Sequence, residues 1–567
     1  MKKCFYLSLA MCIFFTHCFT AEVNTPTTAT TPEKSIEKPA VTPEPDKLEV
    51  ILNNNGLQKL SYGNYSFFRH PSDGDLTPFA RTPIFQKDKE TRIDSSATIS
   101  RVLNSQTSTI LQTYSWGLIS AIYDIHDTRL DITVTVTNKS PELLSNINLQ
   151  FARMTFPQVP KVSFVGQDPF EFNGGSGAVN AMQRPPVVLV DYGKAAYVVA
   201  GNRYTENFTA GVFFAEDKGN INRTGIGLTD ISPGTSKTAV LSLCFGKKGD
   251  TLRSLGGEFI DAYAHVNPMT LRWPDRRPIG KIFLASSGNG PDQMENNPNR
   301  WFMNAKDVNI SNDEGKEVFR EKLLKYADTA IDALKKLEAQ GGITWDPEGQ
   351  RTGHTYYGDP RIIPDIAPEM EYRGKHDTTT IDAYFNKFKE AKLYHGICIR
   401  PQHVTLKDKY WVQEELKTSI ERLAELDAKI SYAVKRWDTK LFYIDSDYAV
   451  TAWEYRELHA RYPDVLLIPE WETPLHYAYT APLQSFSHFG ISNAQTPPSI
   501  RDLYPKSFIV TFADGAKAAK PDAKEALLAG IRGGDIMMVN AWYVTGDFDT
   551  IKEFYAATHP IEKKADK

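Results

Sequence analysis

The feature that most constrains the fold is a regular alternation of short apolar runs and helical segments between about residues 280 and 560. The runs predicted as strands are residues 281–288, 341–346, 394–402, 440–447, 464–472, 489–493, 507–514 and 535–543. Segments with helical spacing lie between or after them, at residues 313–340, 381–392, 413–433, 451–461, 477–485, 523–533 and 549–557. Eight strands with crossover helices over about 280 residues predict a TIM (β/α)8 barrel.

Residues 47–266 have a different pattern, in which short alternating runs are broken by Gly, Asn, Asp and Pro. Within residues 130–138, the apolar side chains of every second residue share one face. Many strands and one short helical passage at the end predict a large antiparallel β-sandwich. The expected fold class is therefore multidomain, with an N-terminal β-sandwich, a Pro/Arg-rich linker at residues 267–279 and a barrel at residues 280–560.

The two ends of the chain predict export and a tether. Residues 1–21 combine two lysines, a short apolar run and a small final residue, which is typical of a signal peptide. Residues 22–46 are rich in Thr, Pro, Lys and Glu and predict a disordered tether, and residues 561–567 form a charged tail. The protein is therefore expected in the periplasm or outside the cell. A lipoprotein anchor at Cys18 is less favoured, because no small residue precedes this cysteine.

The composition of the chain limits the kinds of partner and cofactor that are expected. Hydrophobic residues make up 41% of the chain and charged residues 24%, and the formal net charge of −4 gives no basic excess for nucleic acid. No segment after the leader is long and apolar enough to predict a membrane span. Cys244 and Cys398 lie among apolar residues and predict buried, unpaired thiols. The sequence predicts no cofactor and no catalytic metal, since the first barrel strand lacks His-x-His and no other metal-ligand spacing is present.

In a (β/α)8 barrel the active site forms at the carboxyl ends of the strands. The candidates there are Trp345, Asp346 and Glu348 after strand two, Arg400 and His403 after strand three, Asp445 and Asp447 after strand four, Glu470, Trp471 and Glu472 after strand five, and Trp542 after strand eight. Sugars are bound by carboxylate hydrogen bonds and by stacking on aromatic rings. This set of residues therefore predicts a carbohydrate site.

Glycoside hydrolysis needs one protonated carboxyl group and one ionised carboxylate. Asp445 and Asp447 have the same parity along their strand, as do Glu470 and Glu472, so alternation does not separate the members of a pair. We expect Asp447 rather than Asp445 to be the nucleophile or base, because the outer residue is freer to reach substrate. Glu470 is favoured as the acid for its place beside Trp471, and Glu472 remains an alternative.

The other polar candidates have structural alternatives. Asp346 and Glu348 are expected to contact sugar hydroxyls, to provide one of the catalytic pair, or to form ion pairs with Arg351 or Arg361. Arg400 is expected to pair with Asp346 or Asp445, or else to bind a substrate carboxylate. His403 is a candidate hydroxyl-binding group, although a single histidine is more often structural.

The segment LFYIDSD at residues 441–447 ends the predicted fourth strand in aspartates, after a large N-terminal sandwich. This arrangement resembles the α-galactosidase and α-glucosidase-like retaining enzymes, in which a supersandwich precedes the barrel and a strand-four aspartate is the nucleophile. The resemblance implies an exo-acting glycosidase. It differs at strand six, where the family carries its acid and residues 489–493 have none.

The sequence thus predicts an exported glycoside hydrolase, acting from the ends of extracellular glycans. One alternative is a glycosidase for acidic sugars, such as a sialidase, with Arg400 binding the carboxylate. The other is a glycan-binding barrel without catalysis.

Overall fold

A computed structural model describes the following parts of the chain: residues 46–69, 79–86, 90–92, 100–155, 159–172, 179–202, 209–214, 221–285, 297–303, 308–350, 357–408, 410–485, 495–512 and 521–541. The predicted signal peptide, nearly all of the predicted tether, Trp542 and the expected helix at residues 549–557 lie outside these ranges.

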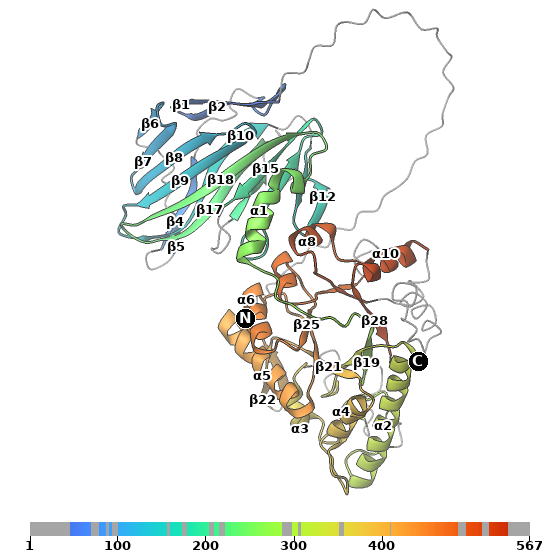
Figure 1. Cartoon of the computed structure of the whole chain (residues 1–567). Helices are drawn as coiled ribbons and strands as arrows, with labels where there is room; N and C mark the ends of the chain where they lie inside the picture. The colour runs from blue at the N-terminus through green and yellow to red at the C-terminus, as the bar shows by residue number, and fades with distance from the viewer. Residues whose placement is uncertain are drawn as a thin grey trace, which may run out of the picture. The chain divides into compact units, whose positions relative to one another are not determined.

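The N-terminal part is built of antiparallel sheets (Figure 1). The nine-stranded sheet consists, in order, of β12 (Gln167–Glu171), β11 (Lys161–Phe164), β14 (Val187–Asp191), β15 (Ala195–Gly201), β18 (Ser236–Lys247), β9 (Arg129–Asn138), β8 (Gly117–Ile125), β7 (Thr109–Tyr114) and β6 (Ser100–Asn104). The six-stranded sheet consists of β13 (Val179–Asn180), β16 (Thr209–Phe214), β17 (Ile221–Ile231), β10 (Leu143–Thr155), β4 (Phe79–Gln86) and β5 (Glu90–Arg92). A small sheet pairs β1 (Leu48–Asn53), β2 (Gly56–Tyr62) and β3 (Tyr65–Ser66).

The two larger sheets share one buried hydrophobic cluster. Ile132 of β9 and Leu241 of β18 lie in it together with Ile147 of β10 and Ile226 of β17. Buried and partly buried residues alternate along the whole of β9, as the sequence predicts. Period-two alternation therefore puts one face of each sheet into a common core.

Helix α1 (Leu252–Val266) connects the sheets to the C-terminal part. Thr251 caps its first turn in a capping box with Ser254. A side chain in place of Gly256 would meet Val187 of β14 at 2.8 Å, so a glycine is needed for this close packing. The Tyr263 hydroxyl donates a hydrogen bond of 2.8 Å to the carbonyl of Ala181. The helix is thereby fixed against the N-terminal sheets.

The C-terminal part contains a parallel eight-stranded sheet that nearly closes into a barrel. Its strands, in sheet order, are β25 (Leu466–Pro469), β24 (Leu441–Ile444), β21 (Tyr394–Ile399), β20 (Gly341–Trp345), β19 (Ile279–Phe283), β28 (Ile536–Asn540), β27 (Val510–Phe512) and β26 (Leu483–Ser485). At the seam between β25 and β26, the Ala481 amide donates to the Leu467 carbonyl at 3.0 Å.

Helical segments and one hairpin connect these strands. They are α2 (Asp313–Lys336), η1 (Pro360–Ile362), α3 (Ile363–Ile366), α4 (Thr380–Glu390), the hairpin β22 (His403–Lys407) with β23 (Tyr410–Glu414), α5 (Ser419–Trp437), α6 (Ala452–Arg461), η2 (Pro474–Ala478), α8 (Pro498–Leu503) and α10 (Pro521–Arg532). None of the described helices is long and apolar enough to cross a membrane.

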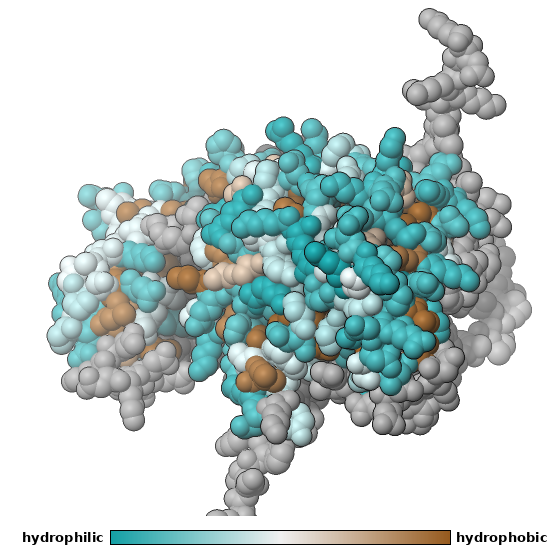
Figure 2. All heavy atoms as spheres, turned by 90° about the horizontal axis from the view of Figure 1, so that it is seen from below, coloured by the Kyte–Doolittle hydropathy of each residue, from teal (hydrophilic) through white to brown (hydrophobic). Residues whose placement is uncertain are grey.

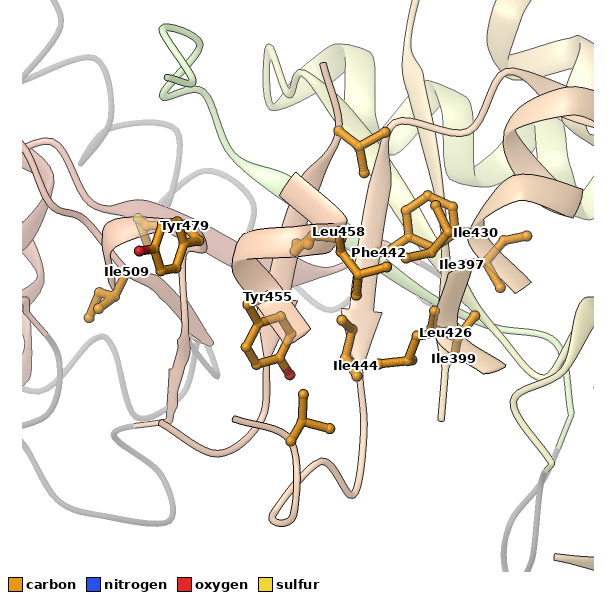
Figure 3. Close-up of a cluster of buried hydrophobic side chains, with 14 of the residues drawn as sticks. Ile397, Ile399, Leu426, Ile430, Phe442, Ile444, Tyr455, Leu458, Tyr479 and Ile509 are labelled. Carbon is orange, nitrogen blue, oxygen red and sulfur yellow. The ribbon is translucent and has the colours of Figure 1, made fainter. Parts of the chain in front are cut away.

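The strands of the parallel sheet are buried on both faces. Ile397 and Ile399 of β21 and Phe442 and Ile444 of β24 lie in one cluster with Leu426 and Ile430 of α5 and with Tyr455 and Leu458 of α6 (Figure 3). The alternate residues Cys398 and Tyr443 belong to a second cluster inside the sheet. Cys244 and Cys398 are both buried and form no disulfide bond within the described residues, as predicted. On the face drawn in Figure 2, hydrophobic side chains are scattered among hydrophilic ones.

Two predicted elements were wrong. Residues 477–485 are not a helix, because η2 ends at Ala478 and the sixth strand of the sheet is the three-residue β26; the segment 489–493, where that strand was expected, lies outside the described residues. Helix α5 begins at Ser419 rather than at Gln413, since Thr418 and Glu421 form its capping box and residues 403–414 form a hairpin.

Replacing Phe442 by Ala tests the core between the sheet and helices α5 and α6. The ring is fully buried, so we expect the free energy of unfolding to fall by roughly 3–5 kcal/mol in chemical denaturation. Ile420→Ala on α5 is the control, because Ile420 is 73% exposed and its loss should change stability little. A similar small effect of both substitutions would contradict the described packing.

Candidate active site

The register of three neighbouring strands places three charged side chains in a row. Ile399 of β21 pairs with Ile444 of β24, which pairs with Pro469 of β25. The next residues are Arg400, Asp445 and Glu470, and their backbones continue the ladder: the Asp445 amide donates to Ile399 at 2.9 Å and the Glu470 amide to Ile444 at 3.0 Å. The three side chains therefore project from the ends of adjacent strands, at equivalent positions of the parallel sheet.

Arg400 and Asp445 form an ion pair with little exposure to solvent. The Arg400 Nε and Nη2 atoms lie 2.7 and 2.6 Å from Oδ2 of Asp445, and Nη1 donates to Gln413 of β23 at 3.1 Å. A guanidinium group this close favours the ionised form of the carboxyl group beside it. Asp445 is thus paired with a cation at the edge of the sheet.

Glu470 contacts Asp445, and its surroundings favour the protonated form of its carboxyl group. Its Oε2 accepts the Ser446 amide hydrogen at 2.8 Å, and its side chain shares a hydrogen bond with Asp445. Burial and the neighbouring Asp445 raise the pKa of Glu470 to about 7. Two adjacent carboxyl groups with different affinities for the proton are the arrangement found where one acts as an acid and the other as a base.

Asp346 and Glu348 lie buried after β20. The Asp346 Oδ1 accepts a hydrogen bond of 2.6 Å from Gln350, and the Glu348 Oε1 accepts the amide hydrogens of Tyr357 and Gly358 at 2.9 and 2.6 Å. Burial raises the pKa of Asp346 well above its usual range and that of Glu348 to about 7. Their other carboxyl oxygens, Oδ2 and Oε2, have no hydrogen-bond partner among the described residues.

The expected ion pair between these two acids and Arg361 is absent from the described part of the site. Arg361 instead bonds Asp359 and Glu425, and Arg351 lies outside the described residues. His403 also contacts Glu425, with 3.1 Å between Nδ1 and Oε2. The interactions of Arg361 and His403 therefore gather around Glu425.

Lys281 is a residue of the site that the sequence reasoning missed. Its Nζ lies 4.5, 5.0 and 4.8 Å from the ring centres of Phe283, Trp345 and Phe512, inside the sheet. Burial lowers the pKa of Lys281, while Cys398, Asp445, Asp346 and Glu470 oppose this effect. A lysine within the apolar first strand was the available signal, because a charge there needs compensation. Trp345 is likewise buried and packs on Tyr443 with ring centres 5.1 Å apart.

Asp447 and Glu472 form a second pair of acids, which we call the second level. Each lies two residues after a member of the first pair, Asp447 after Asp445 and Glu472 after Glu470. Asp447 is buried, and its oxygens accept hydrogen bonds from the Trp471 amide at 2.8 Å and from the Tyr455 hydroxyl. Glu472 accepts hydrogen bonds from the Tyr477 hydroxyl and from Gln484. Burial raises the pKa of each acid to about 7. The two pairs of acids therefore have separate surroundings, although both aspartates follow β24 and both glutamates follow β25.

A cavity of about 750 Å³ adjoins this second level. We call it the side cavity. Its wall includes Asp447 and Tyr448 after β24, Trp471, Glu472 and His476 after β25, Asn180 of β13, and Met182 and Gln183 of the turn after β13. Trp471 is 53% exposed. In the described parts of the chain, no group of three or more His, Cys, Asp and Glu side chains is placed to hold a metal ion.

No protein-family model and no curated protein matches the chain. Among solved structures, it is similar to the GH36 alpha-galactosidase AgaB from Geobacillus stearothermophilus, with 13% identity, a TM-score of 0.44 and coverage of 88% of this chain and 76% of that chain. For AgaA from the same organism, the identity is 13% and the TM-score 0.42, with coverage of 87% of this chain and 76% of that chain. For the galactosidase domain of the alpha-galactosidase-sucrose kinase AgaSK, the identity is 11% and the TM-score 0.41, with coverage of 84% of this chain and 71% of that chain. The resemblance that the sequence indicates is thus found among solved structures, while the function of this chain has to be inferred from its site.

The buried carboxyl groups predict a stability that falls as the pH rises from the usual carboxyl range to about 7. Because the pKa of Glu348 is raised to about 7 in the folded state, its contribution is present below its usual pKa and is lost as the pH rises through 7. Between pH 6 and 8, we expect Glu348→Gln to lose about 1 kcal/mol less unfolding free energy than the wild type. Glu321→Gln, at an exposed position of α2, should follow the wild type. Equal pH dependence in all three proteins would contradict the burial of Glu348.

Proposed function

We propose that this chain is a glycoside hydrolase in which Asp445 and Glu470 are the catalytic carboxyl pair. The observation that carries the proposal is the row Arg400, Asp445 and Glu470, in which one carboxylate is paired with a guanidinium and its neighbour has a pKa of about 7. Glycoside hydrolysis needs such a pair, one group ionised and the other protonated. The row lies at the carboxyl ends of parallel strands, where barrel enzymes carry their chemistry.

The close contact of the two groups favours a mechanism with retention. A retaining pair has the smaller separation, about 5–5.5 Å, and an inverting pair needs a wider gap for a water molecule. Since Glu470 shares a hydrogen bond with Asp445, the two groups are nearer to the retaining separation and have to move apart to admit the sugar. In the proposed first step the Asp445 carboxylate attacks C1 of the sugar while Glu470 gives its proton to the leaving oxygen. In the second step Glu470 takes a proton from water, whose oxygen attacks C1 and releases Asp445.

Asp445 fits the role of nucleophile better than Asp447, although the sequence position favours Asp447. Both oxygens of Asp447 already accept hydrogen bonds, and its raised pKa reduces the ionised fraction at neutral pH. The Trp471 amide is one of its two donors. Asp447 is therefore proposed to position the loop that carries Trp471.

Arg400 bears on the alternative of an acidic sugar. Its Nε and Nη2 atoms are engaged by Asp445 and its Nη1 by Gln413, so binding a substrate carboxylate would require Arg400 to leave Asp445. A neutral sugar is the proposed substrate. Export is proposed from residues 1–21. Action at chain ends is proposed from the resemblance of the sandwich-and-barrel order and of residues 441–447 to exo-acting retaining glycosidases.

Hydrolysis of a panel of aryl glycosides, including a sialoside, tests the proposed roles. Asp445→Asn should lower kcat about a thousandfold or more with every substrate that the wild type hydrolyses. Glu470→Gln should lose activity with poor leaving groups but keep most of it with activated ones, which need no protonation. Asp447→Asn should lose less than Asp445→Asn. Equal losses for both aspartates would contradict the assignment, and glycan binding without turnover would favour the non-catalytic alternative.

The pH dependence supplies a second test. Because Glu470 acts in its protonated form, kcat of the wild type with a poor leaving group should fall as the pH rises through about 7. With an activated substrate, the Glu470→Gln variant should lack this alkaline decline. If the decline persists unchanged in the variant, another group donates the proton.

A further inference from the structure

We propose that Lys429 of helix α5 is a positioning residue for the two catalytic carboxyl groups. It acts through residues 400–402, which join β21 to β22 and which we call the connector. Lys429 fixes the backbone of the connector, and side chains of the connector fix Asp445 and the turn that holds Glu470. This inference rests on the proposed function and adds to it a residue that acts through other residues.

Lys429 is a buried cation on the face of α5 that packs on the parallel sheet. Its side chain is 0% exposed, and it lies three residues after Leu426, which shares a hydrophobic cluster with Ile399 of β21 (Figure 3). Burying an ammonium group costs free energy, because the group loses its hydration. An apolar side chain at this position would avoid that cost, so the lysine indicates a specific role for the ammonium group.

The contacts of the Lys429 ammonium group account for its three N–H donors. Nζ donates to the carbonyl oxygens of Arg400 at 2.8 Å and of Gln402 at 2.7 Å, and it lies 3.3 Å from Oε1 of Glu425. The two carbonyl oxygens come from the first and the last residue of the connector. The Arg400 amide donates to the Gly358 carbonyl at 3.2 Å. One buried cation thus fixes the connector at both ends.

Lys429 belongs to a network in which opposite charges balance. Its Nζ lies 4.0 Å from Oδ2 of Asp359, and Arg361 contacts the same two acids, Asp359 and Glu425. Burial lowers the pKa of Lys429, while Asp359 and Glu425 oppose this effect. Within the described part of the chain, Arg361 makes no hydrogen bond to the connector. The two cations therefore share their acids but differ in their contact with the connector.

The first residue of the connector leads to the proposed nucleophile. Two nitrogen atoms of the Arg400 guanidinium lie 2.7 and 2.6 Å from Oδ2 of Asp445. The third, Nη1, donates to Gln413 of β23, whose own amide group donates to the Tyr357 carbonyl at 3.0 Å. Because the backbone and the side chain of Arg400 are both held, the position of the guanidinium beside Asp445 is fixed.

The last residue of the connector leads to the proposed acid. Gln402 is 4% exposed, and its Nε2 donates to the Ser446 carbonyl at 3.1 Å. The Ser446 amide in turn donates to Oε2 of Glu470 at 2.8 Å. Both members of the catalytic pair are therefore connected to Lys429 by a short series of hydrogen bonds, one through Arg400 and the other through Gln402 and Ser446.

Release of the connector should change the proton affinity of Glu470 in a known direction. Burial and Asp445 raise the pKa of Glu470, whereas the Ser446 amide and Arg400 lower it. If the connector moves, Ser446 and Arg400 contribute less and the pKa of Glu470 rises further. The other titratable groups that interact with Glu470, which a substitution of Lys429 leaves in place, are Tyr443, Asp447 and Lys281.

Lys429→Met tests this role, since methionine is close to lysine in length and has no charge. With a poor leaving group, we expect kcat to fall about tenfold or more and KM to change less than kcat. The alkaline decline of kcat should move to higher pH by about half a unit or more. Arg361→Met is the matched control, because it removes a cation from the same network. It should lower stability but leave kcat and the alkaline decline as in the wild type.

The comparison of the variants separates positioning from a general effect of removing a buried cation. Equal changes in Lys429→Met and Arg361→Met would refute the positioning role, as would an unchanged kcat in Lys429→Met. If Lys429→Met does not fold, Gln402→Met decides, because it keeps every charge of the network and removes the donor to Ser446. An alkaline decline at higher pH then supports the role of the connector, and an unchanged decline refutes it.

Failure of the proposed function gives a different result, namely no hydrolysis of any substrate by the wild type. The pKa of Glu470 is then measured directly by carbon-13 NMR of labelled glutamate carboxyl groups, with Glu470→Gln to assign the signal. A higher pKa of Glu470 in Lys429→Met than in both the wild type and Arg361→Met supports positioning by Lys429. The same pKa in all three proteins refutes it.

Discussion

The parallel register of β21, β24 and β25 is the constraint on which the site depends. It places Arg400, Asp445 and Glu470 at the same level on adjacent strands, where the guanidinium contacts Asp445 and Asp445 contacts Glu470. A shift of one residue in β24 would point the Asp445 side chain to the other face of the sheet and place Ser446 between Arg400 and Glu470. The pairing of Ile399, Ile444 and Pro469, all within the hydrogen-bonded ladder, thus fixes an electrostatic arrangement that none of the three charged residues would produce alone.

The same loops carry two sets of acids with different surroundings. Asp445 and Glu470 contact each other and Arg400, whereas Asp447 and Glu472 accept hydrogen bonds from Tyr455, the Trp471 backbone, Tyr477 and Gln484. Ser446 between the two aspartates has a positive φ of 55°, an uncommon backbone conformation for a residue with a side chain. Such a turn directs neighbouring acids of one strand into different surroundings, which supports catalysis by the first pair and positioning by the second.

Much of this could be predicted from the sequence. Alternation along residues 130–138 and the strand and helix order after residue 280 indicate the antiparallel sheets and the parallel sheet, because burial of one or both faces leaves a periodic pattern. The three-residue β26 was missed, since so short a strand has no period to detect. The choice between Asp445 and Asp447 depends on the register with β21 and on the donors Tyr455 and Trp471, which are distant along the chain. Parity treats Asp445 and Asp447 alike, and the outer position that favours Asp447 in the sequence does not reveal these donors.

The most direct test is to trap the sugar on the enzyme with an activated fluorosugar that slows the second step, followed by tandem mass spectrometry. Residues 441–456 form one tryptic peptide that contains both Asp445 and Asp447, so fragment masses separate the two sites. We expect one sugar bound to Asp445 and none in the Asp445→Asn variant. A sugar on Asp447 or on another residue, or turnover with no covalent adduct, would contradict it.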